Sequence, residues 1–163
     1  MARSNQMASF DRLFRAQLAR QTDALIGELG AIVATPAPPQ AGAIAFCQEA
    51  DWRSFPVYTY MMDAALRNSL LDERPYPSLL LQSAGPLVPE GVIDQAAFED
   101  AGIGTYGRGG KLLAEWFAEC WDRAGGAAFP LPGFIYLHDD TRYYDLRAKR
   151  YVEEFEELAK VAG

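Results

Sequence analysis

The chain has 163 residues, half of them hydrophobic and 23% charged, which is a composition typical of a globular protein and unlike that of a disordered one. Its 22 acidic residues outnumber 15 lysines and arginines, and the formal net charge of −7 disfavours nucleic acids and anionic membrane surfaces as partners. The sequence contains neither the apolar core of a signal peptide nor a membrane-spanning run, so we expect a cytoplasmic protein.

The first predicted element is a long amphipathic helix that begins at Ser9 and ends near Gly30. Residues 1–8 are expected to be flexible. The proline-rich segment 35–39 cannot continue a helix, and we interpret it as an extended connector. Too little chain precedes this connector to build a separate core, so it is not a domain boundary.

Two apolar runs, 43–47 and 55–61, are separated by a polar stretch and predict a β-hairpin. Asp63 can cap a short helix over residues 64–71, which prolines then end. The compact apolar run 78–82 predicts a further strand.

The second half of the chain begins with a predicted helix over residues 94–101. The clearest amphipathic stripe in the sequence then predicts a helix over 111–124. Residues 133–138 and 142–146 flank an Asp-Asp-Thr connection that suits a β-hairpin. From about Ala148 the spacing of apolar residues predicts a final helix with an outward row of glutamates.

This order of elements does not alternate strictly between strands and helices, so it favours an α+β fold over a doubly wound one. We predict a single domain over residues 1–163. It should contain an antiparallel or mixed sheet built from hairpins, with helices packed against it and long helices at both ends. The oligomeric state cannot be predicted from the sequence.

The segment from Gly102 to Gly107 has the glycine spacing of a dinucleotide-binding turn. That turn must follow a buried strand, whereas the residues before Gly102 predict an acidic helix. A phosphate-binding loop is also disfavoured, because Gly110 stands where the lysine is required. We therefore interpret these glycines as a flexible loop and expect no cofactor.

The two cysteines, Cys47 and Cys120, match none of the close spacings of zinc or redox motifs. We expect both to be free thiols, and we expect no metal site.

His138 is the single histidine and is followed by Asp139 and Asp140. These residues could provide acid–base chemistry or hold a divalent cation. However, neighbours along a strand point to opposite faces, and aspartates are common in turns because they bond their own backbone. The turn interpretation is therefore favoured.

The remaining signal is an abundance of aromatic residues close to carboxylates in predicted loops. Aromatic anchors within an acidic rim suit a surface that binds a basic protein. We expect a non-catalytic inhibitor or immunity-type protein that neutralises a basic toxin or nuclease, with an interface formed by Glu49, Asp51, Trp52, Asp139 and Asp140. The alternative is a small hydrolase or nuclease-like enzyme that uses His138 with nearby carboxylates.

Overall fold

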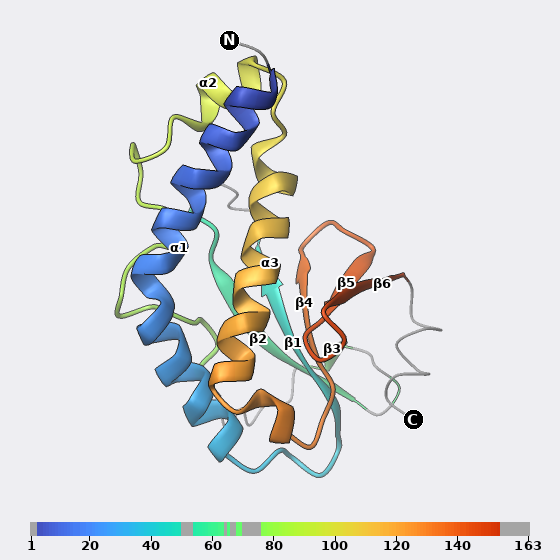
Figure 1. Ribbon diagram of the computed structural model, residues 1–163. Coiled ribbons are helices and arrows are strands. Elements are labelled where there is room, and N and C mark those ends of the chain that lie inside the picture. Colours follow the sequence, from blue (N-terminus) through green and yellow to red (C-terminus); the bar gives the residue numbers. More distant parts are fainter. Residues whose placement is uncertain (1–2, 50–53, 64, 66–67, 70–75, 154–163) are drawn as a thin grey trace.

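The computed structural model describes residues 3–49, 54–63, 65, 68–69 and 76–153 (Figure 1). Its elements form an α+β domain in which two long helices pack against one sheet. In chain order they are α1 (Arg3–Ala34), β1 (Ala41–Gln48), β2 (Val57–Asp63), β3 (Asn68–Ser69), α2 (Gln95–Asp100), α3 (Thr105–Arg123), the 3₁₀ helix η1 (Gly126–Ala128), β4 (Gly133–Leu137), β5 (Arg142–Asp145) and β6 (Arg150–Glu153).

The described strands form one sheet in the order β3-β2-β1-β4-β5-β6. Strands β1 and β4 are parallel and central, and each of the other neighbouring pairs is antiparallel. The parallel pair aligns Ile44 with Gly133 and Gln48 with Leu137. The prediction of a mixed sheet built from hairpins is therefore confirmed, and the chain crosses between its two halves through α2 and α3.

Helices α1 and α3 run side by side and cover the same face of the sheet (Figure 1). Their aromatic side chains meet those of the sheet in the main core, where the rings of Phe46 and Phe117 have centroids 4.7 Å apart. Phe14 from α1 packs edge to face on Phe55 at 4.8 Å. Burial of each such ring contributes roughly 1.5–3 kcal/mol, so this layer stabilises both helices on the sheet.

The opposite face of the sheet carries a second, smaller hydrophobic cluster. Because successive strand residues point to opposite faces, Ala45 and Phe134 belong to this cluster, while their neighbours Ile44 and Ile135 belong to the main core. Tyr60 and Tyr136 pack partly buried against it.

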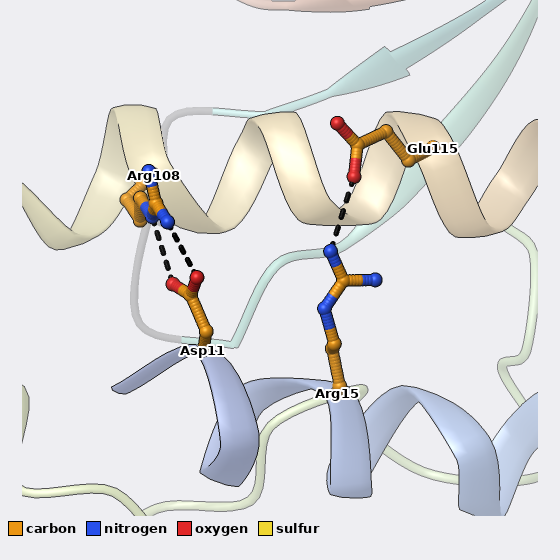
Figure 2. Close-up of polar contacts among 4 residues, drawn as sticks. All are labelled: Asp11, Arg15, Arg108 and Glu115. Carbon is orange, nitrogen blue, oxygen red and sulfur yellow. Dashed lines mark hydrogen bonds and ion pairs between the residues drawn. The ribbon is translucent and has the colours of Figure 1, made fainter. Parts of the chain in front are cut away.

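Ion pairs tie the two long helices together (Figure 2). The guanidinium group of Arg108 binds both carboxylate oxygens of Asp11, with Nε 2.7 Å from Oδ1. Arg15, one turn after Asp11 on α1, donates to Glu115, two turns after Arg108 on α3, at 3.2 Å. These contacts fix the register of α1 against α3.

Both long helices begin earlier than the sequence predicts. Helix α1 starts at Arg3, so residues 3–8, which we expected to be flexible, form its first turns. Helix α3 starts at Thr105 rather than Lys111, and the carboxylate of Glu99 accepts the N–H of Thr105 at this start. The helix predicted over 94–101 is confirmed as α2, with Asp94 capping the N–H of Ala97.

Two predicted elements in the middle of the chain are wrong. Within the helix predicted over 64–71, Asn68–Ser69 is strand β3 paired with β2, and most of the other residues lie outside the described part. The strand predicted over 78–82 contributes a single bridge, from Leu79 to Tyr58. The chain turns immediately afterwards, because Leu81 has a left-handed φ of 59° and donates its N–H to Glu28 at 2.7 Å.

The C-terminal helix predicted from Ala148 is also wrong. Arg150–Glu153 forms strand β6, which pairs with β5 across a turn closed by Asp145. The carboxylate of Asp145 accepts the N–H groups of Arg147 and Ala148, each at 2.8 Å. Residues 154–163 lie outside the described residues.

Candidate functional site

The carboxyl ends of β1 and β4 place two predicted site residues next to each other. Because these strands are parallel and Gln48 aligns with Leu137, the chain leaves both strands at the same end, which forms one border of the sheet. The N–H of His138 donates to the carbonyl oxygen of Gln48 at 2.9 Å, which continues the ladder by one bond. Glu49 and His138 are therefore neighbours in space, although about half the chain separates them.

The imidazole of His138 lies between two carboxylates. Its Nδ1 is 3.0 Å from Oδ1 of Asp139, and its Nε2 is 3.7 Å from Oε2 of Glu49. The side chains of His138 and Asp139 are 47% and 80% exposed, whereas that of Glu49 is 29% exposed. We call the surface formed by Glu49, His138 and Asp139 the acidic edge.

The acidic edge adjoins the sheet face opposite helices α1 and α3, which carries the smaller hydrophobic cluster. Tyr60 of β2 donates its hydroxyl to Oε1 of Glu49 at 3.0 Å. Tyr136 of β4 lies on this face of the sheet, and its ring lies 4.7 Å from that of Tyr143. Tyr60 thus contacts the acidic edge directly, and Tyr136 and Tyr143 lie on the same face of the sheet.

Asp140 takes a different role from its neighbour. Its carboxylate accepts from the guanidinium group of Arg142 at 3.1 and 2.8 Å and from the backbone N–H of Arg142 at 2.9 Å. These bonds hold the pKa of Asp140 below its usual value. The side chain is only 18% exposed. Asp140 therefore closes the β4–β5 turn, and the charge of its carboxylate is balanced within the chain.

Buried polar groups lie just inside the acidic edge. The side-chain amide of Gln48 is 1% exposed and makes no hydrogen bond in the part of the chain that the structure describes. On the first turn of α3, burial raises the pKa of the Tyr106 hydroxyl, and the nearby charges of Asp139 and Glu49 raise it further. The polar character of this edge therefore extends into the interior, where unpaired groups are costly.

The two cysteines are free, as predicted, and both are buried. Burial raises the pKa of each thiol to about 11. A thiol with this pKa carries little thiolate near neutral pH, so neither Cys47 nor Cys120 is suited to nucleophilic chemistry.

The glycine segment from Gly102 to Gly107 spans the exit of α2 and the start of α3. Gly102 has a φ of +76° and ends α2, and Gly104 caps α3. Oε1 of Glu99 accepts the N–H of Thr105 at 2.6 Å and its hydroxyl at 2.5 Å. A carboxylate of the chain itself thus occupies the helix N-terminus, where a dinucleotide would place its phosphates.

Of the residues predicted for an interface, the structure brings Glu49 and Asp139 together around His138 and places Asp140 in the adjoining turn. Asp51 and Trp52 lie outside the described residues. Tyr60 was not among the residues predicted for the site. The available signal was strand alternation, which puts Tyr60 on the same face as Tyr58, and Tyr58 pairs with Cys47 near the carboxyl end of β1.

Within the described residues, no three histidine, cysteine or carboxylate side chains are grouped so that they could hold a metal ion. The helices that the structure describes include none with the length and apolar character needed to cross a membrane.

Comparisons with protein-family models, with curated proteins and with solved structures found no match to this chain.

Proposed function

We propose that this protein is a non-catalytic binding domain of the inhibitor or immunity type, and that its acidic edge takes a basic protein partner. The observation that supports this proposal is the convergence of Glu49 and Asp139, from distant parts of the chain, on one surface strip at the carboxyl ends of β1 and β4. A toxin or nuclease with a basic active-site surface is the kind of partner that such a strip would cover and neutralise.

The chemistry of the strip suits protein recognition. Carboxylates at the edge attract a basic surface over a distance and pair with its cations on contact. The partly buried rings of Tyr60 and Tyr136 offer rigid area that is apolar in its body and polar at its tip.

The distribution of charge disfavours helix α1 as the surface for a basic partner. Helix α1 carries four arginines against three carboxylates, so the acidic surplus of the chain lies outside α1. A basic partner would therefore be drawn toward the rest of the molecule rather than toward α1.

Affinity capture from the source cell tests the proposal. The bait is the full chain, compared with a variant that combines Glu49→Gln with Asp139→Asn. The matched control combines Asp23→Asn with Glu119→Gln, which removes the same charge from α1 and α3. We expect the wild type and the control to retain the same basic protein at low salt and to release it as salt rises, since surface charge pairs are screened.

The double variant at the acidic edge should retain markedly less of that protein. With the partner purified, the loss should appear mainly as slower association, which is how edge charges act. Retention by the edge variant equal to that of the control would refute this site, and an acidic captured protein would refute the proposed chemistry.

A second candidate is a small hydrolase or nuclease-like enzyme that uses His138 with nearby carboxylates. It is favoured by the 3.0 Å approach of Asp139 Oδ1 to His138 Nδ1, which could orient the imidazole as a general base. The variant His138→Ala separates the two functions. It should abolish hydrolysis of a nucleic-acid or phosphodiester substrate by an enzyme, but it should reduce capture by a binding protein far less than the double variant does, because both carboxylates remain.

A further inference from the structure

A partly enclosed cavity of about 240 Å³ lies between the helix layer and the loop that follows β2. This cavity differs chemically from the acidic edge, because its walls are almost entirely apolar. Its lining includes none of the residues of that edge. Its lining includes Leu25 of α1, Val57 of β2, Trp116 and Phe117 of α3, and Leu80 and Leu87 of the loop.

The walls of this cavity are fixed by specific contacts. Trp116 donates its indole N–H to the hydroxyl of Thr22 on α1 at 3.0 Å, which sets the plane of the ring. On the loop side, Leu81 is held by the bond from its N–H to Glu28 at 2.7 Å. The cavity is therefore bounded by an oriented indole ring on one side and by an anchored backbone on the other.

Two lining residues adopt a backbone conformation that is costly for their type. Phe55 and Leu81 have φ values of 55° and 59°, in the left-handed region that favours glycine. Such residues cost about 1–3 kcal/mol each and are concentrated at binding and active sites. Here they lie on the wall of the same cavity, which singles out this cavity from the rest of the core.

The chemistry of the lining limits what can bind. Among the described residues that line the cavity none is charged, and Ser54 and Gln82 supply its polar side chains. A charged ligand would lose its hydration without gaining a partner, and such a loss is strongly unfavourable. An apolar ligand would instead give the wall atoms the contacts that they otherwise lack.

We infer that this cavity binds a small uncharged apolar molecule, of the size of one or two fused aromatic rings or a short aliphatic chain. An apolar cavity of roughly 150 Å³ suffices for benzene, so a volume of about 240 Å³ leaves room for a somewhat larger ligand. This site is separate from the acidic edge and does not depend on the function proposed for that edge.

Toluene and benzoate, which share a ring size and differ in charge, are the probes that test this inference. Toluene should raise the melting temperature of the full chain in a saturable way, because it binds the folded state. It should also shift the NMR signal of the Trp116 indole N–H, which Trp116→Phe identifies by its loss. Benzoate should do neither at the same concentration.

Filling the cavity should weaken this binding. Val57→Phe adds a ring to the wall and should reduce the affinity for toluene about tenfold or more. Val152→Phe is the matched control, because Val152 is 1% exposed but belongs to the cluster on the opposite face. Leu79→Phe, at a partly exposed position of the lining, replaces Val57→Phe if that variant does not fold.

Three outcomes would overturn the inference. The first is that toluene leaves both the melting temperature and the Trp116 signal unchanged up to its solubility limit. The second is that binding is as strong in the filled variants as in Val152→Phe. The third is that benzoate binds as tightly as toluene, which would refute an uncharged ligand.

Discussion

At the scale of single residues, Gly109 decides how closely α3 approaches the loop before β2. A Cβ atom built at Gly109 would lie 2.6 Å from Cζ of Phe55, well inside van der Waals contact. Phe55 cannot easily move away, because its ring packs on Phe14 at 4.8 Å and its backbone has a φ of 55°. The helix therefore needs a residue without a side chain at this point.

We predict that Gly109→Ala destabilises the protein by about 1–3 kcal/mol, the usual effect of overpacking a core. Alanine is the better helix former by about 1 kcal/mol, so the steric effect must outweigh that gain. The control is Gly107→Ala on the same helix, where a Cβ would meet nothing within 4 Å. That variant should be more stable than the wild type by up to about 1 kcal/mol. Urea denaturation monitored by circular dichroism measures both.

If both glycine variants changed stability in the same direction and by similar amounts, the close approach of Phe55 to α3 would be contradicted. Equal urea m-values across the three proteins would establish that the comparison concerns the folded state.

Residue types alone indicated an unusual glycine segment but not its purpose. We interpreted the segment as a loop, because glycines are typical of flexible loops between helices. The need for Gly109 and Gly110 inside α3 depends on the side chains that face them. Phe55 and Leu137 approach these glycines only in the folded chain. The proximity of Glu49 and His138 was likewise beyond prediction, since it depends on the register of two parallel strands.

At the scale of elements, the pairing of α1 with α3 rests partly on the ion pairs of Figure 2. The pair of Asp11 and Arg108 has two parallel bonds and side chains only 22% and 32% exposed. Arg15 and Glu115 share one bond and are 55% and 34% exposed. Geometry and burial therefore favour the first pair as the stronger one.

We predict a coupling energy of about 1 kcal/mol between Asp11 and Arg108, and of about half that or less between Arg15 and Glu115. Double-mutant cycles with Asp11→Asn and Arg108→Met, and with Arg15→Met and Glu115→Gln as the control pair, measure both values. Equal coupling in the two cycles would contradict the assignment.

The dependence on pH gives a second test of the Asp11 pair. The bonds from Arg108 lower the pKa of Asp11 below its ordinary value of 3.8. A carboxyl with a lowered pKa contributes stability that is present above the unfolded-state pKa and is lost as pH falls through the folded-state pKa. The stability difference between wild type and Asp11→Asn should therefore be constant near neutral pH and should shrink below pH 3.8.

Elements were predicted well where periodicity was strong and local, and poorly where a turn decided the outcome. The amphipathic stripe gave α3 except for its first turns, and both hairpins were confirmed. The C-terminal helix failed at Lys149, which has a left-handed φ of 53° that glycine or asparagine usually supplies. Without that signal, the apolar spacing from Tyr151 onward satisfied a helix equally well.

At the scale of the whole molecule, each half of the chain depends on the other. The hairpin of β1 and β2 joins the hairpin of β4 and β5 through the central parallel pair, and α1 packs on α3. The sequence predicted a single α+β domain, because the length and composition of the chain restrict the number of domains and the class of protein. It did not predict the strand order, because the parallel contact joins distant segments and leaves no local pattern.

This interdependence predicts one cooperative unfolding transition. Helical circular dichroism, which α1 dominates by length, and the fluorescence of the buried Trp116 and Trp121 on α3 should give the same midpoint in urea. Phe46→Ala should lower both midpoints together, because Phe46 lies in β1 and its ring contacts Phe117 and Trp121 at 4.7 and 5.7 Å. Removal of this ring should cost about 3–5 kcal/mol. A variant in which the circular dichroism midpoint falls while the fluorescence midpoint stays would mean that the two halves unfold independently.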